Sequence, residues 1–323
     1  MAADVVVVGA GIVGLTSALR LRQAGADVVV WTAQPPEQTT SAVAAAVWYP
    51  TRVEGQPRVL EWGERTLAEF VRQAADGVPG VVMRVTRMLH RAAVQHEPWW
   101  APAVGDLRWL APAEVHPPFV GGWRFTAPIV EMPRYLPWLV ARFTAAGGEV
   151  RLRRVESLRE AAGAAPIVVN ATGLAARDLC GDSAVEPVRG QIVLTSNPGL
   201  TESVRDQDNP EGYTYIHPRR DDVVLGGTFE SGVWDATPDP VACEAIRRRC
   251  LALVPELAAA RTIGYRAGLR PTRQGGVRLE TGSGGLIHNY GHGGAGVTLA
   301  WGCADRVVEL AVNPPASRAT TAP

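Results

Sequence analysis

The first thirty residues pass from an apolar run to a helical pattern and back to an apolar run. Val5–Val8 form an uninterrupted apolar stretch, as a strand buried on both faces of a parallel sheet requires. Apolar side chains then recur at helical spacing from Ile12 to Leu21, and Gly25 stands where such a helix would end. A second apolar run covers Val28–Trp31. The pattern predicts a βαβ unit at the start of the chain.

Three glycines separate the first predicted strand from the helix, at the spacing G-x-G-x-x-G. Gly9 permits a tight turn, Gly11 lets the backbone approach a pyrophosphate, and Gly14 lets the helix pack closely on the strand. The amino-terminal end of the helix would then face the phosphates. A purely structural turn is the alternative, but the strand–loop–helix context favours nucleotide binding. The predicted contacts are Gly9, Ala10, Gly11, Ile12, Val13 and Gly14.

The acidic residue that usually binds the adenosine ribose is missing from this unit. It should follow the glycines by about 20 residues, near Trp31–Thr32, but the sequence there reads "WTAQPPE" and Glu37 comes too late. No arginine stands there to bind a 2′-phosphate either. Ribose contacts must come from Thr32, the backbone or water. This absence weakens the interpretation as an NAD- or NADP-dependent dehydrogenase.

A second segment favours FAD. "APIVVNATG" (Ala165–Gly173) reads as a short buried strand that ends in small residues, which leave room for a cofactor. Before it, the pattern predicts a helix from near Pro133 to Gly147 and a strand to about Val155. This order of elements fits a doubly wound, Rossmann-like FAD-binding domain.

The remaining segments follow another pattern. Residues 49–131 are rich in Trp, Pro and Arg, and period-2 strands dominate from Gln191 to Ile263. We therefore expect an α/β fold, α+β overall, with a mainly antiparallel β substrate domain inserted into the FAD-binding domain. The expected FAD-binding domain comprises residues 1–48, 132–186 and 266–312, the substrate domain comprises 49–131 and 187–265, and 313–323 form a disordered tail.

Composition excludes several kinds of partner and chemistry. The 323 residues carry 32 basic and 32 acidic side chains, so no net charge attracts nucleic acid or an anionic membrane. All the basic residues are arginine, which removes Schiff-base chemistry by lysine. The four cysteines are scattered without a C-x-x-C pair, which is typical of reduced thiols in a cytoplasmic protein. The apolar runs are too short to span a bilayer.

Two histidines four residues apart lie in the glycine-rich segment "GLIHNYGHGGAGVTLAWGC". His288 and His292 would share one face only on a helix, and the intervening glycines disfavour a helix there. No neighbouring carboxylate or cysteine completes a local set of metal ligands. We therefore expect no metal, and interpret the segment as a loop whose backbone contacts a cofactor.

Several motifs, taken in order along the chain, resemble the D-amino-acid oxidase family. The glycine-rich segment near the end of the chain is the most specific of them. The matching segments are "VVVVGAGIVGLTSALRL", "TTSAVAAAVWYP", "VEMPRYLPWLVARF", "VVNATG", "PVRGQIV", "YIHPRRDDVVLGGTFE", "GLRPTR" and "HNYGHGGAGVTLAWGCA".

The resemblance implies oxidative deamination of D-amino acids by noncovalently bound FAD. Hydride transfer to flavin N5 would give an imino acid, which hydrolyses to a 2-oxo acid and ammonia, while dioxygen reoxidises the flavin and yields hydrogen peroxide. The expected partners are therefore a D-amino acid and dioxygen. For the assembly, a homodimer is the candidate.

The resemblance also implies roles for particular residues. Arg270 and Tyr215 would bind the substrate carboxylate, because a guanidinium grips it bidentately and a phenol adds one hydrogen bond. The backbone carbonyl of Gly294 would accept a hydrogen bond from the substrate amine. The other expected residues of the substrate site are His217, which stands at a usually apolar position, Phe229, which replaces a tyrosine of some members, and Tyr49.

The remaining cofactor contacts follow from the same resemblance. The segment near residue 40 would wrap the phosphates and the flavin edge, and the glycine-rich segment would lie against the flavin ring. A helix that begins near Gly296 would stabilise the reduced, anionic flavin. The expected residues are Thr39, Thr40, Ser41, Ala45, Ala46, Val47, Val155, Thr172, Gly173, Gly291, Gly293, Gly296, Val297 and Thr298.

Three alternatives to a neutral D-amino-acid substrate stay open at this point. A D-aspartate oxidase would need extra positive charge near the substrate side chain, for which the candidates are Arg52, Arg219, Arg220 and His217. A glycine- or sarcosine-oxidase-like amine oxidase would share mainly the nucleotide fold. A non-catalytic flavin-binding protein would keep the fold and its colour without turnover.

Overall fold

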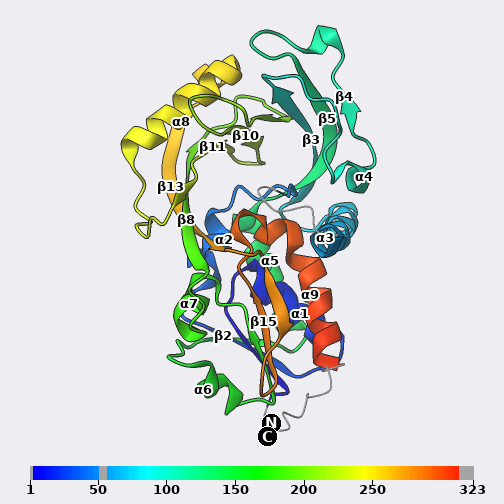
Figure 1. The fold of residues 1–323 in the computed structure, drawn as a ribbon, viewed down its shortest axis with the longest axis vertical. Helices are drawn as coiled ribbons and strands as arrows, with labels where there is room; N and C mark the ends of the chain where they lie inside the picture. The colour runs from blue at the N-terminus through cyan, green and yellow to red at the C-terminus, as the bar shows by residue number, and fades with distance from the viewer. Residues whose placement is uncertain (1–2, 51–56, 313–323) are drawn as a thin grey trace, which may run out of the picture.

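The computed structural model describes residues 3–50 and 57–312, which form two β-sheets stacked along the long axis of the molecule (Figure 1). The first sheet has six strands in the order β14-β15-β7-β1-β2-β6. Its strands are parallel except for the antiparallel edge strand β14. They are β1 (Val5–Val8), β2 (Val28–Thr32), β6 (Glu149–Leu152), β7 (Ile167–Asn170), β14 (Arg278–Thr281) and β15 (Leu286–Tyr290).

Helices cover this sheet and bury its valines. The four valines of β1 are all buried, as the uninterrupted apolar run predicts. Helix α1 packs against α5 and α9 in one apolar core that includes Leu15, Leu139 and Leu299. The helices of this part are α1 (Ile12–Gln23), α5 (Met132–Ala145), α6 (Leu158–Ala162), α7 (Ala176–Leu179) and α9 (Gly296–Val312).

The second sheet has nine strands and is mostly antiparallel. Eight of them run in the order β12-β8-β11-β10-β9-β3-β5-β4, and β13 pairs with β8. Among the described strand pairs of this second sheet, only β3 and β9 run parallel to each other. The strands are β3 (Val81–His90), β4 (Arg108–Trp109), β5 (Gly121–Val130), β8 (Val185–Thr195), β9 (Ser203–Asp206), β10 (Thr214–Pro218), β11 (Val223–Gly226), β12 (Glu230–Ser231) and β13 (Thr262–Arg273).

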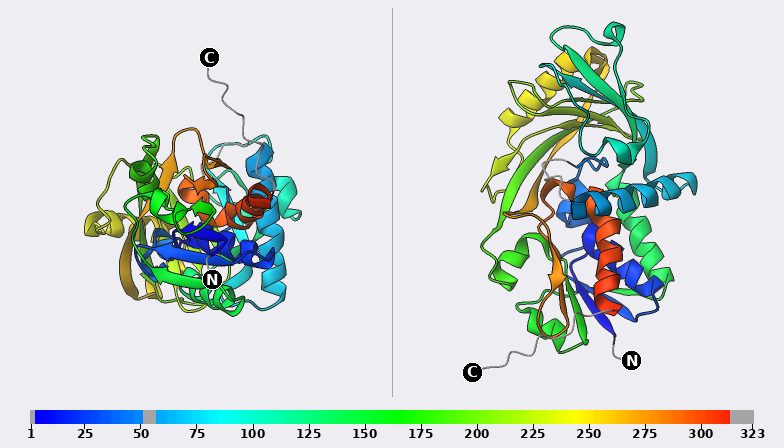
Figure 2. Two further views of the ribbon diagram at one scale, coloured as in Figure 1. Left: turned by 90° about the horizontal axis from the view of Figure 1, so that it is seen from below. Right: turned by 45° about the vertical axis from the view of Figure 1, so that its right-hand side comes forward.

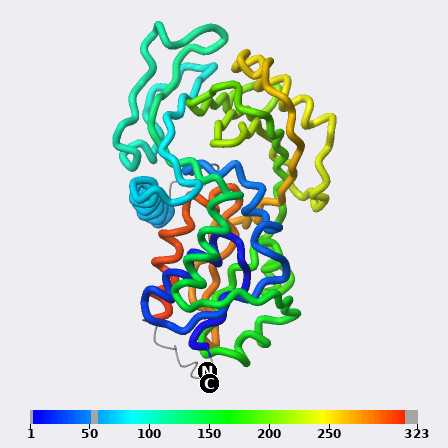
Figure 3. The backbone as a smooth tube through the Cα atoms, turned by 180° about the vertical axis from the view of Figure 1, so that it is seen from behind, coloured from blue at the N-terminus to red at the C-terminus, as the bar shows by residue number. Residues whose placement is uncertain are grey.

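Helix α8 (Pro240–Leu253) covers the outer face of the second sheet, while α3 (Pro57–Ala75) lies at the junction beside α9 (Figure 2). Seen from behind, the β3–β5 part and the β8–β13 part of the second sheet rise as two arms from the first sheet (Figure 3). The remaining short helices are α2 (Thr40–Val43), α4 (Ala101–Val104) and the 3-10 turns η1 (Pro36–Gln38), η2 (Pro112–Glu114), η3 (Gly173–Ala175), η4 (Pro255–Ala259) and η5 (Gly293–Ala295).

The architecture agrees with the expected fold class. The predicted βαβ unit, the helix after Pro133 and the helix that begins at Gly296 are all present. The division into an FAD-binding and a substrate domain stays a prediction, and its boundaries at 186/187 and 265/266 fall within strands β8 and β13. The predicted disordered tail, 313–323, lies outside the described residues.

Candidate active site

The glycine-rich turn after β1 is shaped by close backbone approach. Gly9 has a φ of +113°, and a Cβ there would lie 2.3 Å from the carbonyl oxygen of Ala171 on the neighbouring β7 turn. A Cβ on Gly14 would lie 1.9 Å from the carbonyl oxygen of Gly9. Any side chain at these two positions would therefore push the turn away from the start of α1. Gly14 allows α1 to pack closely against the turn, and it does not itself line the cavity.

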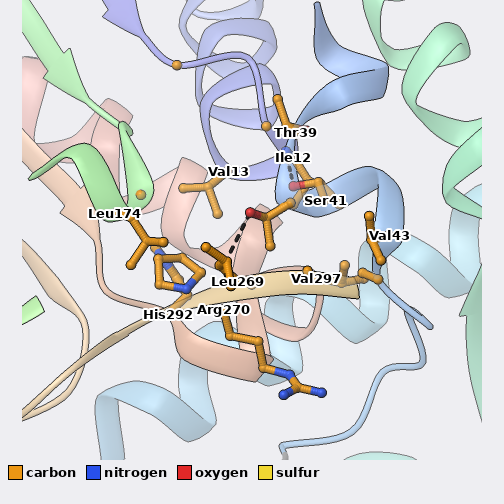
Figure 4. A pocket seen from close by; sticks show the side chains of 18 of the residues that line it. Ile12, Val13, Thr39, Ser41, Val43, Leu174, Leu269, Arg270, His292 and Val297 are labelled. Atoms are coloured by element: carbon orange, nitrogen blue, oxygen red, sulfur yellow. Dashed lines mark hydrogen bonds between the residues drawn. The ribbon is translucent and has the colours of Figure 1, made fainter. Parts of the chain in front are cut away.

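The segment around residue 40 closes over the amino-terminal end of α1. The backbone N–H of Ile12 donates a hydrogen bond to Ser41 Oγ at 3.0 Å, and the Thr40 hydroxyl donates to the carbonyl oxygen of Leu269 at 3.1 Å (Figure 4). The first N–H groups of a helix have no intrahelical partner, so this end of α1 is suited to hold phosphate oxygens. The geometry fits the predicted phosphate loop.

A cavity of about 650 Å³ extends from this loop to the second sheet. It brings together residues that lie far apart in the sequence, which is the usual form of a ligand site. Of the predicted residues, these line it: Gly9, Ala10, Gly11, Ile12, Val13, Thr39, Thr40, Ser41, Ala45, Ala46, Val47, Tyr49, Val155, Thr172, Gly173, Tyr215, His217, Phe229, Arg270, Gly291, Gly293, Gly294, Gly296 and Val297.

The end of the cavity beside β2 is built without a carboxylate from the described residues. Thr32 and Gln34 line it, whereas Glu37 does not. The hydroxyl of Thr32 donates to the carbonyl oxygen of Gln34 at 2.7 Å, so that hydroxyl is already engaged. Arg153, which the sequence did not single out, stacks with its guanidinium carbon 3.8 Å from the centre of the Trp31 ring. A cation thus lies where an acidic residue was expected.

At the other end of the cavity, Tyr215 projects from β10 over Gly226 of the neighbouring strand β11 and over Gly227, which follows that strand. Its register partner is Gly226, where a Cβ would lie 2.0 Å from the phenol ring. Burial raises the pKa of Tyr215 to about 12, so the phenol stays protonated and can donate a hydrogen bond to a carboxylate. The chain therefore makes room for this ring by omitting side chains beside it.

Arg270 reaches the same region from β13 across the neighbouring strand β8. A Cβ on Gly190 would lie 2.2 Å from one guanidinium nitrogen of Arg270, so only glycine leaves this path open. The guanidinium donates to the carbonyl oxygen of Thr228 at 3.0 Å and lies 4.2 Å from the centre of the Phe229 ring. Gly294 borders it, with its Cβ position 3.6 Å from Arg270 Cδ. In Figure 4, Arg270 extends away from Ile12 and Ser41.

Three further side chains of the second sheet complete this end. His217 shares a face of β10 with Tyr215, because alternate residues of a strand share a face, and Tyr213, which comes just before β10, places its ring edge-on to Tyr215 at 5.4 Å between ring centres. His217 stacks on Tyr215, and burial, together with nearby Arg205, lowers its pKa well below the ordinary value. The sequence had not singled out Tyr213 or Arg205, and both line the cavity.

Tyr49 is held in place by hydrogen bonds to Thr298 and Gln207. Its backbone exchanges hydrogen bonds with the Thr298 hydroxyl at 3.2 and 3.0 Å, and Gln207 Nε2 donates to its phenol oxygen at 3.0 Å. Thr298 therefore supports Tyr49 from behind and does not line the cavity. Burial raises the pKa of Tyr49 to about 12, so its phenol is neutral.

The two histidines of the glycine-rich segment face different surroundings. His292 lines the cavity, and its Nε2 has no hydrogen-bond partner among the described residues. His288 lies on β15, where its Nδ1 is 3.4 Å from Asn170 Nδ2 and 3.9 Å from Cys180 Sγ. Within residues 3–50 and 57–312, no three His, Cys, Asp or Glu side chains group to bind a metal ion. The buried Nε2 of His292 offers a polar contact to a bound cofactor.

Acidification should destabilise the fold through His292. Burial lowers the pKa of His292 to about 4, against 6.5 for an exposed histidine. At pH values between 4 and 6.5 the unfolded chain therefore binds a proton at this residue that the folded chain does not bind. Stability should therefore fall as the pH drops from 6.5 towards 4. Thermal unfolding midpoints at pH 7.0 and 4.5 measure this, and His292→Gln should reduce the difference. An equal difference in the variant would assign the pH dependence to other groups.

The glycine turn, the open end of α1 and the cavity between the sheets define a dinucleotide-binding protein of the α/β class. A family model described as FAD dependent oxidoreductase matches residues 4–310, so the chain belongs to that family. The protein is therefore an FAD-dependent oxidoreductase, and the expected fold class and cofactor are confirmed.

Individual proteins agree with this assignment. The chain is 51% identical to a D-amino-acid oxidase of Rubrobacter xylanophilus over 313 residues, which cover 96% of each chain. It is 44% identical to a D-amino-acid oxidase of Streptomyces coelicolor, over 95% of this chain and 96% of that one. The structure of glycine oxidase from Bacillus cereus superposes with a TM-score of 0.82 at 20% identity, over 96% and 95% of the two chains. The family resemblance noted from the motifs is thus confirmed.

The described residues fit FAD in several independent ways. The glycine turn admits no Cβ at two positions, the start of α1 faces the cavity, and η5 and α9 bring further backbone N–H groups to the same space. Within the residues that the structure describes, no helix has the length and apolar character needed to cross a bilayer.

Proposed function

We propose that the protein oxidises D-amino acids with dioxygen, giving a 2-oxo acid, ammonia and hydrogen peroxide. The observation that carries this proposal is the convergence of Arg270, Tyr215 and Gly294 at the end of the cavity farther from the phosphate loop. A guanidinium and a neutral phenol suit a carboxylate, and a backbone carbonyl suits an ammonium or amine. An α-amino acid carries both groups on one carbon.

The cofactor would be held by the glycine turn, the segment around Ser41 and the loop that contains Gly291 and Gly293. When bound, FAD supplies the acceptor for the two electrons and the hydrogen of the substrate α-carbon. The chain itself fixes the substrate: Arg270 and Tyr215 hold the carboxylate, and the carbonyl of Gly294 orients the amine. Such positioning lowers the barrier by removing rotational freedom before the reaction.

The titratable groups at this end are not tuned as bases for neutral pH. Burial lowers the pKa of His292 to about 4 and raises the pKa of Tyr215 to about 12. Burial also lowers the pKa of His217 well below its ordinary value. An efficient general base has a pKa near the working pH, so these groups support a reaction in which no side chain removes a proton from the α-carbon.

A substrate panel tests the proposal. Purified, FAD-loaded protein is assayed with glycine, with sarcosine and with the D and L forms of Ala, Met, Phe, Asp and Lys, and hydrogen peroxide is measured. We expect peroxide from D-alanine and other D forms, and none from the L forms. Turnover of glycine or sarcosine without D-alanine would favour a glycine-oxidase-like activity, and a yellow protein that oxidises nothing in the panel would favour a non-catalytic flavin-binding role.

Gly190→Ala should weaken substrate binding without unfolding the protein. The new Cβ would meet the end of the flexible Arg270 side chain at 2.2 Å, and that end can swing away at little cost to the fold. Because the displaced guanidinium loses its carboxylate geometry, KM for D-alanine should rise by about 10-fold. Steady-state kinetics and a thermal melt measure the two effects. Gly121→Ala, with open space at its Cβ position, is the control.

Two further proposals concern the setting in which the protein works. We propose a cytoplasmic location, which the four free cysteines support because such thiols persist in a reducing compartment. We also propose a homodimer as the assembly to be tested by sedimentation.

A further inference from the structure

The end of the cavity beside β2 is lined by two arginines. Arg153 and Arg154 directly follow strand β6, which pairs with β2 at the edge of the first sheet. The backbone N–H of Arg153 donates to the carbonyl oxygen of Thr32, the last residue of β2, at 2.8 Å. Strand β2 itself carries no arginine, so the neighbouring strand brings to its end a charge that the order of residues along the chain does not reveal.

Both guanidinium groups are available to a ligand. Arg153 and Arg154 are exposed, and in the described ranges of the chain neither forms an ion pair, while Glu149 of the same strand pairs with Arg151 at 2.6 Å. The guanidinium carbon of Arg153 lies 3.8 Å from the centre of the Trp31 ring. Stacking on an aromatic ring occupies the face of a guanidinium and leaves the N–H groups at its edge able to donate.

The uncharged side chains at this end differ in what they still offer. The hydroxyl of Thr32 donates to the carbonyl oxygen of Gln34 at 2.7 Å, and Gln34 Nε2 donates to the carbonyl oxygen of Gln38 at 2.9 Å. Trp31 lines the cavity and is only 2% exposed, yet its indole N–H has no hydrogen-bond partner among the described residues. A buried donor of this kind indicates that an acceptor belongs beside it.

The charge at this end favours a phosphate over a ribose hydroxyl. Among the described residues, no aspartate or glutamate lines the cavity. In dinucleotide-binding folds, a carboxylate beyond the second strand binds the ribose 2′-hydroxyl, whereas a nearby arginine accommodates a phosphate on that oxygen. A guanidinium can bind phosphate through two parallel hydrogen bonds. Arg153 and Arg154 therefore stand where a 2′-phosphate is bound in such folds.

We infer that Arg153 and Arg154 form a phosphate subsite, so that the cofactor-free protein binds adenine nucleotides that carry a phosphate on the ribose 2′-oxygen, as NADP does. The 5′-diphosphate of such a nucleotide lies at the glycine turn, and its 2′-phosphate lies at the two arginines. FAD has no 2′-phosphate and uses the same turn, so the two ligands compete. The inference concerns the adenosine end of the cavity and does not depend on the oxidation of D-amino acids.

The other arginines near the cavity do not supply this charge. Arg205 and Arg270 line the cavity from the second sheet, at the end assigned to the substrate. Arg219 and Arg220, which the sequence suggested for that end, do not line the cavity. Arg52 lies outside the described residues. In the described part of the chain, the arginines at the β2 end are thus the pair that follows β6.

Titration of the full-length, cofactor-free protein with 2′,5′-ADP and with 5′-ADP measures the contribution of the 2′-phosphate. The 2′-phosphorylated compound should bind about 10-fold more tightly, because hydrogen bonds between charged groups are stronger than those to a hydroxyl. Isothermal calorimetry gives both dissociation constants. Flavin fluorescence, which is quenched when FAD binds, shows whether each compound displaces FAD. This comparison on the unmodified protein needs no variant.

Three variants assign the preference to the two arginines. Arg153→Met keeps the apolar stem against Trp31 and should lose most of the preference for 2′,5′-ADP. The double variant Arg153→Met, Arg154→Met should bind the two nucleotides equally. Arg151→Met removes the same charge from β6 at a residue that does not line the cavity, and should keep the full preference. A thermal melt of each variant confirms that it is folded.

Equal affinities of the unmodified protein for the two nucleotides, or no binding of either, would overturn the inference. So would a preference that persists in the double variant. Binding of 2′,5′-ADP without displacement of FAD would also overturn it, because the phosphate would then lie outside the cofactor site. Each of these results would leave the proposed oxidation of D-amino acids intact, since that activity is measured separately through hydrogen peroxide.

Discussion

Arg270→Ala should lower kcat/KM for D-alanine on the order of 1000-fold. The variant loses a bidentate, charge-assisted contact to the substrate carboxylate, and each such hydrogen bond contributes about 1.5–3 kcal/mol. The fold should survive, because the guanidinium lies at the cavity and donates a hydrogen bond to the carbonyl oxygen of Thr228, a backbone atom. Peroxide assays over a range of D-alanine concentrations measure the loss.

Arg266→Ala is the matched control for this variant. Arg266 lies on the same strand, is exposed, and donates to the carbonyl oxygen of its neighbour Tyr265 at 2.8 Å. Its removal changes the net charge equally and should leave kcat/KM within a factor of about 2. If Arg270→Ala turned over D-alanine as well as Arg266→Ala does, the carboxylate would be bound elsewhere.

Gly14→Ala should weaken FAD binding by at least about 100-fold, through the loss of backbone hydrogen bonds to phosphate. The new Cβ would lie 1.9 Å from the carbonyl oxygen of Gly9 and 2.9 Å from its carbonyl carbon. Both are backbone atoms, so the turn itself must move away from α1. Quenching of flavin fluorescence during titration of the cofactor-free protein measures the dissociation constant without recourse to turnover.

Gly163→Ala provides the comparison for this measurement. Gly163 ends α6 in the first sheet's layer with a φ of −73°, and a Cβ there would lie 3.6 Å from its nearest neighbours, which is ordinary contact. FAD affinity should be unchanged. Equal affinities of Gly14→Ala and Gly163→Ala for FAD would show that the phosphates are held away from the glycine turn.

Local patterns predicted the nucleotide end of the molecule well. The buried valines of β1, the glycine turn and helix α1 are neighbours in the sequence, so periodicity and spacing specify them together. Tyr215 and Arg270 came only from the family resemblance. The space that their side chains occupy depends on Gly226 and Gly190, which lie on other strands. Nothing in the local sequence around these glycines indicates that role.

The residues that the sequence missed follow from tertiary pairing. Tyr213 could have been found, because it precedes Tyr215 and His217 at period two in the sequence. Arg205 could not, since β9 (Ser203–Asp206) is a short strand of mostly polar residues whose partners β10 and β3 are set by the folded sheet. Exposed arginines such as Arg220 look the same in a sequence as the buried Arg205, and only burial distinguishes them.

Anaerobic mixing of the FAD-loaded protein with D-alanine measures whether the bound flavin accepts electrons from a D-amino acid. The visible flavin absorption should disappear with D-alanine, persist with L-alanine, and return when oxygen is admitted, with one hydrogen peroxide formed per flavin. This result would follow from a site that orients the D-configured α-carbon towards the cofactor. A flavin that stays oxidised with every D-amino acid of the panel would show that the protein is not a D-amino-acid oxidase.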